Sequence, residues 1–215
     1  MLRVMPPGRF VTFEGPDGAG KSSQLARLAS WLRGRGEAPL VTREPGGTAM
    51  GDRIREALFG AQDHAALPLT EALLMNASRA QLVAEVVRPA LAAGRLVLCD
   101  RYADATLAYQ GYGHGLDLAV LRRLIAIATG GLQPDLTVLL DLPVEAGLAR
   151  KHTGREELNH LDLMSLDFHQ RVRAGYLELA AQEPGRWRVI DASRPAEEVQ
   201  AELRAVLAPI IVRGA

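Results

Sequence analysis

Residues 15–22 read Gly-Pro-Asp-Gly-Ala-Gly-Lys-Ser and match the pattern G-x-x-x-x-G-K-[ST] of a phosphate-binding loop. The six residues before this motif, 9–14, are rich in β-branched and aromatic side chains, which is typical of a buried strand. After Gly20, apolar residues recur at helical spacing as far as Leu32. A strand, a glycine-rich loop and a helix in this order predict an α/β fold whose loop binds phosphate.

The residue types in the loop have physical reasons. Glycines allow backbone N–H groups to approach phosphate oxygens, and the first turn of the following helix contributes its positive dipole end. We expect Lys21 to reach the β- and γ-phosphates and the Ser22 hydroxyl to ligate Mg²⁺. The residues predicted to bind the nucleoside triphosphate here are Gly15, Pro16, Asp17, Gly18, Ala19, Gly20, Lys21, Ser22 and Ser23.

Charge and composition exclude several other classes of protein. The 25 basic residues balance 25 acidic ones, so no overall basic surface is predicted for a nucleic acid. Two of the basic residues are lysines and 23 are arginines, so a lysine at the motif position is more informative than any single arginine. The single cysteine, Cys99, excludes an internal disulfide and a cysteine-based metal site.

Neither a membrane segment nor a secretory signal is expected. No apolar run approaches the ~18–20 residues that span a bilayer. The first residues also lack the apolar segment of a signal peptide. Together with the single cysteine, these features predict a cytoplasmic protein with no membrane partner and no nucleic-acid partner.

Short apolar runs alternate with longer helical patterns along the chain. The predicted strands are 9–14, 39–43, 96–99, 136–140 and 187–190. The predicted helices are the one after Gly20 and six more at 50–59, 69–93, 117–129, 144–150, 165–182 and 195–208. This alternation predicts one α/β domain over residues 1–215, with helices on both faces of a mostly parallel five-stranded sheet, as in P-loop proteins. The polar segment 151–164 is predicted to be an exposed, mobile lid.

A phosphate loop alone does not separate kinases, GTPases, motors and partitioning ATPases. A guanine-reading Asn-Lys-x-Asp motif is absent from the sequence, because Asn76 precedes alanine and Asn159 precedes histidine. A partitioning ATPase would normally carry an extra lysine early in the loop, where this chain has Pro16 and Asp17.

Three further segments narrow the choice. They are 42–48 (Thr-Arg-Glu-Pro-Gly-Gly-Thr), 100–111 (Asp-Arg-Tyr-Ala-Asp-Ala-Thr-Leu-Ala-Tyr-Gln-Gly) and 78–81 (Ser-Arg-Ala-Gln). Two of them follow predicted strands, where an open α/β sheet builds its site. With the phosphate loop, they resemble the thymidylate kinase family from about residue 9 to 207. The resemblance implies a homodimeric kinase that transfers phosphate from ATP to dTMP directly, in line and with Mg²⁺, to make dTDP for dTTP synthesis.

The resemblance also implies roles for charged residues. Arg43 and Arg101 follow different predicted strands and are expected to hold the acceptor phosphate bidentately, although each could instead pair with Glu44 or Asp100. Asp17 is expected to meet the 3′-hydroxyl of the acceptor sugar and to help order the metal and phosphates. Asp100 is expected to contact Mg²⁺ through water.

The base and sugar are expected to bind beside these phosphate ligands. The resemblance places Arg79 on a thymine carbonyl, Thr106 at a polar base-reading position, and Tyr109 under the sugar, where it disfavours a 2′-hydroxyl. Tyr109 could alternatively be an aromatic residue that only fills the core. The predicted acceptor-binding residues are Asp17, Arg43, Pro45, Met75, Arg79, Arg101, Ala105, Thr106, Tyr109 and Gln110.

Members of this family carry a catalytic arginine either in the phosphate loop or in the lid. Gly18 occupies the loop position here, so the lid must supply the arginine. We expect Arg155 on the transferring phosphates and Arg150 on the adenine or the ATP phosphates, although both could be solvated lid charges. The predicted catalytic residues are Lys21, Arg101, Arg155 and Asp17.

Some positions differ from the family pattern. Met75 stands where an aromatic ring usually stacks on thymine, and Ala105 replaces a usual serine. In the lid, Asn159 and His160 replace a common Asp-Arg pair, and Asp162 replaces a usual glutamate. These differences leave open the selectivity for thymine and the contacts that close the lid.

Two other functions stay open. A kinase for another nucleoside monophosphate or for a deoxynucleoside would share the loop, and in a nucleoside kinase Asp100 would be the candidate base for the sugar 5′-hydroxyl. A non-catalytic P-loop switch that binds a protein partner would not need the acceptor-side arginines.

Overall fold

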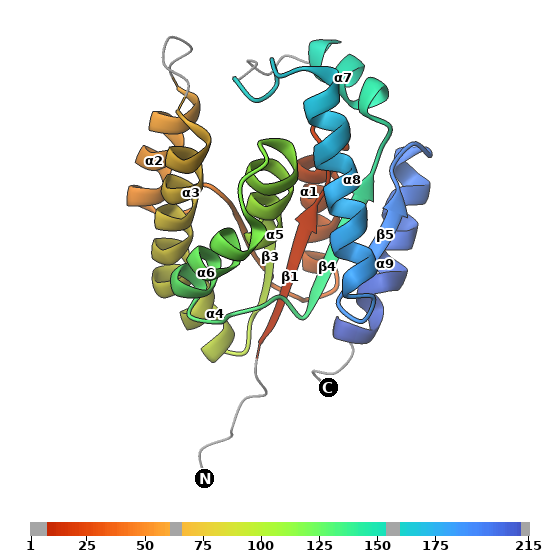
Figure 1. Cartoon of the computed structure of the whole chain (residues 1–215). Helices are drawn as coiled ribbons and strands as arrows, with labels where there is room; N and C mark the ends of the chain where they lie inside the picture. The colour runs from red at the N-terminus through yellow and green to blue at the C-terminus, as the bar shows by residue number, and fades with distance from the viewer. Residues whose placement is uncertain (1–7, 61–65, 154–159, 212–215) are drawn as a thin grey trace.

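The computed structural model describes residues 8–60, 66–153 and 160–211 (Figure 1). Its strands form one sheet in the order β2-β3-β1-β4-β5, and every pair is parallel. The strands are β1 (Arg9–Glu14), β2 (Leu40–Arg43), β3 (Leu96–Asp100), β4 (Leu136–Asp141) and β5 (Trp187–Asp191). All five predicted strands are confirmed to within one residue at each end.

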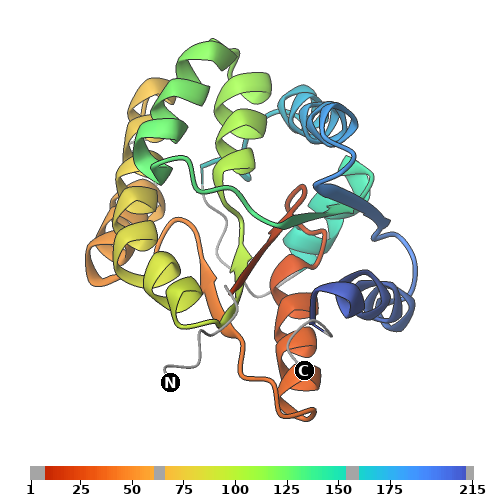
Figure 2. The same ribbon diagram turned by 90° about the horizontal axis from the view of Figure 1, so that it is seen from below.

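Helices cover both faces of the sheet, as the two ribbon views show (Figure 1, Figure 2). One face packs against α1 and α9, and the other packs against α3, η1, α4, η2 and α8. The helices are α1 (Lys21–Arg33), α2 (Ala49–Phe59), α3 (Pro68–Leu82), η1 (Val83–Val87), α4 (Arg88–Ala92), α5 (Ala103–Thr106), η2 (Leu107–Gly113), α6 (Leu118–Thr129), α7 (Val144–Thr153), α8 (Leu166–Gln182) and α9 (Ala196–Ile211).

The central position of β1 in the sheet explains why its apolar residues face both sides. Val11 and Phe13 pack into the core beneath α1 and α9, whereas Phe10 packs on the opposite face against Tyr102. A parallel strand between two helical layers has no solvent face, so both of its sides carry apolar residues. Glu14 is an exception, since it is a fully buried carboxyl at the strand's last position.

The helix formed by α5 and η2 was not predicted by the sequence patterns. It begins at Ala103, directly after the loop that follows β3, and ends in a wide π-helical turn over 107–113. Residues 104–111 are all buried, so this helix lacks the polar face that produces an amphipathic signal. It carries the four predicted acceptor-side residues from Ala105 to Gln110.

The remaining helices agree with the predicted ones, and the predicted helix 69–93 is continuous through α3, η1 and α4. The expectation that segment 151–164 is exposed is wrong for Leu161 and Asp162, which are buried against the body of the protein. No helix within the described ranges is both long and apolar enough to cross a bilayer.

Candidate active site

A cleft of about 970 Å³ opens beyond the carboxyl ends of β1, β2 and β3. This is the edge at which parallel α/β sheets bind ligands, because the loops that leave the strands meet there. The cleft is lined by the predicted residues Asp17, Gly18, Gly20, Lys21, Ser22, Ser23, Arg43, Pro45, Met75, Asp100, Arg101, Ala105, Tyr109 and Arg150.

The phosphate loop passes so close to α7 that a side chain at position 18 has no room. Gly18 has φ +75°, and a Cβ atom there would lie 2.1 Å from the carbonyl oxygen of Gly147. Gly147 is equally confined, because its own Cβ would lie 2.4 Å from the backbone oxygen of Asp17. Backbone packing between the loop and α7 therefore excludes an arginine at loop position 18.

Lys21 lies folded over its own loop. Its ammonium donates hydrogen bonds to the carbonyl oxygens of Gly15 at 3.0 Å and Pro16 at 2.8 Å. Burial, together with the nearby charge of Arg101, lowers the pKa of Lys21 to about 8. An arriving polyphosphate would replace these carbonyl oxygens as the partner of the ammonium.

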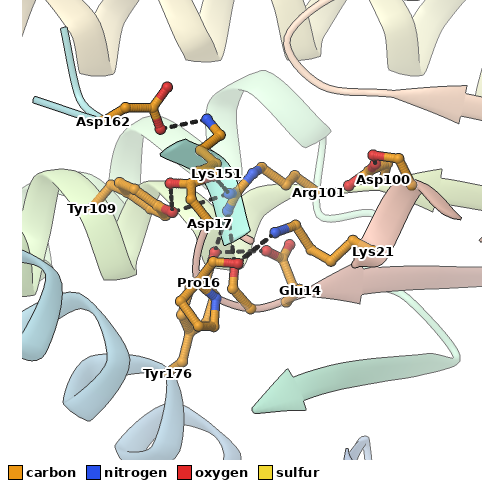
Figure 3. Close-up of polar contacts among 12 residues, drawn as sticks. Glu14, Pro16, Asp17, Lys21, Asp100, Arg101, Tyr109, Lys151, Asp162 and Tyr176 are labelled. Atoms are coloured by element: carbon orange, nitrogen blue, oxygen red, sulfur yellow. Dashed lines mark hydrogen bonds and ion pairs between the residues drawn. The ribbon is translucent and has the colours of Figure 1, made fainter. Parts of the chain in front are cut away.

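An ion pair joins the phosphate loop to the segment after β3 (Figure 3). The Asp17 carboxylate accepts hydrogen bonds from Arg101 Nη2 at 2.7 Å and from the Tyr109 hydroxyl at 2.6 Å. Burial alone would raise the pKa of Asp17, but the charges of Arg101 and Lys21 outweigh burial and hold that pKa well below its usual range. Asp17 is therefore an anion that faces the cleft.

Arginines gather on the other side of the cleft. Arg43 ends β2 beside Asp100 of β3, and its side chain is 59% exposed with Nη2 3.9 Å from an Asp52 oxygen. Arg55 of α2 donates from Nη1 to the carbonyl oxygen of Pro45 at 3.2 Å. Burial and the charge of Arg43 lower the pKa of Arg55. Arg43, Arg55 and Arg101 all line the cleft, and the charges of Arg43 and Arg101 both act on Arg55.

Arg55 and Phe59 were missed by the sequence reasoning, as were the cleft-lining residues Glu44, Lys151 and Leu161. Arg55 and Phe59 lie one helical turn apart on α2, with the guanidinium carbon 5.5 Å from the ring centre. The spacing predicts a shared helix face, but only the packing of α2 shows that this face meets the cleft. Phe59 thus adds an aromatic ring to the cleft, in which Met75 stands at the position where the family usually has one.

Three predicted base-side residues lie behind the cleft lining. Arg79 is 1% exposed and donates from Nε to Glu44 at 2.8 Å and from Nη2 to the Thr106 hydroxyl at 3.1 Å. Gln110 is also buried, and its amide donates to Glu71 at 3.0 Å. Arg79 and Thr106 therefore contact each other behind the cleft lining, and the roles of all three residues toward a base stay predictions.

The chain on either side of residues 154–159 is anchored to the body of the protein. Arg150 donates from Nη1 to the carbonyl oxygen of Ala192 at 3.3 Å, and Lys151 pairs with Asp162. His160 contacts Glu71 of α3, with 2.5 Å between Nε2 and Oε1. Arg155, the predicted catalytic arginine of the lid, lies outside the described residues.

The expected Mg²⁺ ligands form a small oxygen donor set. The Ser22 hydroxyl donates to an Asp100 carboxylate oxygen at 2.5 Å, and both residues line the cleft. Within the described ranges, no three His, Cys, Asp or Glu side chains gather into a metal-binding group. Mg²⁺ in phosphate-binding sites takes few protein oxygens and completes its shell with water and phosphate, so this pair fits it.

Comparisons with known proteins agree on one family. The family model for thymidylate kinase matches residues 13–203. A thymidylate kinase of Thermomicrobium roseum is 54% identical over 205 residues, covering 95% of this chain and 97% of the relative. A thymidylate kinase of Deinococcus radiodurans is 54% identical over 203 residues, covering 94% of this chain and 98% of the relative. The crystal structure of thymidylate kinase from Ehrlichia chaffeensis is similar with a TM-score of 0.75 and 32% identity, covering 94% of this chain and 99% of that one.

The lowered pKa of Lys21 predicts that ATP affinity falls as pH rises above about 8. Bound triphosphate favours the charged ammonium, so above pH 8 binding must take up a proton and the Kd should rise by up to about tenfold per pH unit. Calorimetric titration with a non-hydrolysable ATP analogue, in two buffers of different ionisation enthalpy, measures both effects. In a Lys21→Arg variant the guanidinium stays charged and the pH step should vanish. A wild-type Kd that is constant to pH 9.5 contradicts the prediction.

Proposed function

The chain belongs to the thymidylate kinase family, and from this premise we propose that its cleft holds ATP and dTMP head to head for direct phosphoryl transfer. The enzyme is a nucleoside monophosphate kinase that phosphorylates dTMP to dTDP. One observation carries the assignment of the site. The phosphate loop and the guanidinium groups of Arg43, Arg55 and Arg101 line one cleft, and the Asp17–Arg101 ion pair joins the loop to the segment after β3.

On the donor side, the backbone N–H groups of the loop and Lys21 hold the ATP phosphates. Ser22 and, through water, Asp100 are the residues that would hold Mg²⁺, which when bound neutralises charge on the β- and γ-phosphates. Arg150 of α7 lines the cleft and contacts the adenine or the ATP phosphates. These assignments are supported by the cleft lining and by the Ser22–Asp100 hydrogen bond.

On the acceptor side, Arg43 and Arg101 bind the dTMP phosphate and present one of its oxygens in line with the γ-phosphate. Arg55 joins them because it lines the same part of the cleft. No strong general base is needed, since the attacking atom is already an anionic phosphate oxygen. Catalysis then depends on alignment and charge neutralisation.

The base and sugar lie deeper, toward α3 and α5. Asp17 and Tyr109 contact the sugar, whereas Met75, Ala105 and Phe59 provide the walls of the base site. Arg79, Thr106 and Gln110 are the polar residues that read the thymine edge, and Pro45 shapes the loop beside the acceptor. Arg79 is buried behind these walls in the structure, so it must be uncovered when dTMP binds in order to contact the base.

The domain organisation belongs to the same proposal. Residues 1–215 form one kinase domain with the phosphate loop at 15–22 and a lid at about 151–164. Arg155 from the lid neutralises the transferring phosphoryl group, because Gly18 cannot be replaced by an arginine. We place the enzyme in the cytoplasm, which suits its buried free thiol at Cys99.

An acceptor panel tests the function. With ATP and Mg²⁺, we expect ADP to form rapidly with dTMP, more slowly with dUMP, and at background level with UMP, CMP, AMP and thymidine. Turnover confined to thymidine would indicate a nucleoside kinase with Asp100 as base. ADP release that does not depend on any acceptor would instead support a P-loop switch.

The lid assignment predicts a kinetic defect that is specific to the transfer step. Arg155→Ala should lower kcat by roughly 10³-fold, because an arginine on the transferring phosphate contributes about 10³–10⁵ in rate. The Kd of a non-hydrolysable ATP analogue should change much less. Arg33→Ala, at the exposed end of α1 away from the cleft, is the matched control. A near-normal kcat in Arg155→Ala would exclude this residue from the transfer.

A homodimer is also proposed, through the outer face of α3 and α6. Along α3 the exposed residues Leu69, Leu73 and Ala77 follow each other at helical spacing. The neighbouring α6 exposes Val120 and Ile127, and Ile127 is 80% exposed. Exposed apolar side chains at helical spacing on two adjacent helices are typical of a protein interface.

This interface predicts that charge on α3 dissociates the dimer. Leu73→Glu should change the sedimentation coefficient from that of a dimer to that of a 23.2 kDa monomer, because the carboxylate would be buried without a partner. The control is Val189→Glu, which introduces the same charge on the edge strand β5, on another surface. That variant should remain a dimer. A wild-type protein that sediments as a monomer at micromolar concentration contradicts the proposal.

A further inference from the structure

Arg101 is held in an unusual backbone conformation. Its φ is +66°, and among the described residues it is the only non-glycine with a positive φ. A side chain in this left-handed region is disfavoured and persists only where its surroundings hold it in place. Such strain at a cleft residue raises the question of which groups impose it.

Glu14 holds this segment both at its backbone and, through Tyr176, at the Arg101 side chain. Figure 3 shows Glu14, Tyr176 and Arg101. One oxygen of its carboxyl accepts the backbone N–H of Tyr102 at 2.7 Å, directly after Arg101. The other accepts the hydroxyl of Tyr176 at 2.9 Å, and that hydroxyl accepts a hydrogen bond from Arg101 Nη1 at 3.0 Å. The backbone N–H of Arg101 donates to the carbonyl oxygen of Phe13 at 2.9 Å, so the end of β1 contacts this segment directly twice and a third time through Tyr176.

The two ends of the Arg101 guanidinium have different surroundings. Nη1 donates to the Gly15 carbonyl oxygen and to Tyr176, whereas Nη2 donates to Asp17 and Tyr109. Asp17 and Tyr109 line the cleft and can be reached by a ligand. Tyr176 is fully buried and is not part of the lining, so a ligand cannot reach the Nη1 side.

Burial raises the pKa of Glu14 to about 8, and its Oε2 accepts the Tyr176 hydroxyl, which determines which way that hydroxyl points. A hydroxyl has one proton, and when Glu14 accepts it the oxygen lone pairs face Arg101. Arginine only donates, so this orientation is the one that suits Nη1. Glu14 is fully buried, and water cannot take over either of its contacts.

From this geometry we propose that Glu14 and Tyr176 are positioning residues for the known reaction. They fix the Nη1 side of Arg101, so that Nη2 can exchange Asp17 and Tyr109 for an oxygen of the acceptor phosphate without the guanidinium turning away. The inference rests on the proposed function, which assigns Arg101 to that phosphate. It adds two residues that touch no substrate and act through Arg101.

Tyr176→Phe tests the inference by removing one hydroxyl and keeping the ring. We expect kcat/KM for dTMP to fall about tenfold, as for loss of a buried hydrogen bond worth a factor of ten, while KM for ATP changes less than twofold. The control is Tyr112→Phe. The Tyr112 ring packs on Gly175 beside the same helix, and its hydroxyl takes no part in the Glu14–Arg101 contacts. Its kinetics should equal those of the wild type.

A double-mutant cycle separates positioning from general destabilisation. In an Arg101→Ala background, Tyr176→Phe should cause no further loss in kcat/KM for dTMP, because the group it positions is gone. Glu14→Gln retains a carbonyl oxygen for Tyr102 but turns an N–H₂ toward Tyr176, so it should reproduce the Tyr176→Phe defect without adding to it. Should Glu14→Gln fail to fold, the Tyr176 cycle alone decides.

Three results would overturn the inference. They are wild-type kinetics in Tyr176→Phe, equal losses toward dTMP and ATP, and a loss in the Arg101→Ala background as large as in the wild type. A failure of the proposed function is distinguishable from these. In that case the wild-type enzyme would not phosphorylate dTMP, or Arg101→Ala alone would leave kcat/KM for dTMP unchanged.

Discussion

The ion pair between Asp17 and Arg101 is the contact on which the rest of the site depends. It joins the phosphate loop after β1 to the segment after β3, two segments that are 84 residues apart in the sequence. Parallel pairing of β1 with β3 places Phe13 beside Asp100, so both strands end at the same edge of the sheet. Without that register the donor loop and the acceptor arginine would not share a cleft. Arg43 reaches the same edge because β2 pairs with β3 on the other side.

Charge in this cleft is concentrated although the chain carries no net charge. Lys21, Arg43, Arg55 and Arg101 face a space that receives two polyanions, and the partners of Lys21 and of Arg101 Nη2 are ones that a phosphate can replace. Burial makes the interactions of Lys21 and Arg101 stronger than they would be in water, and it also makes an unpaired charge costly. Asp17 resolves this conflict for Arg101, because it neutralises the guanidinium from the side that opens on the cleft.

Much of the fold and part of the site could be predicted from local patterns. The strands and most of the helices follow from apolar periodicity, and Lys21, Ser22 and Gly20 follow from a motif whose chemistry is local. The helix from Ala103 to Gly113 could not be predicted, because its burial on all sides removes the polar stripe by which a helix is recognised. Arg55 and Phe59 were missed for a different reason. Their helix was predicted, but the direction that its faces take depends on packing against α3.

By itself, then, the sequence determined the order of strands and helices, the phosphate loop and the family, because these depend on neighbouring residues along the chain. Only the tertiary structure decided which distant side chains meet. It brought Phe59 into the cleft that Met75 also lines. It packed the phosphate loop against the backbone of α7, which leaves no room for a side chain at position 18. It also placed Glu14 and Tyr176 behind Arg101. The physical reason is that these contacts cross between strands and helices. Their geometry is set by sheet register and helix packing, neither of which is written in any single segment.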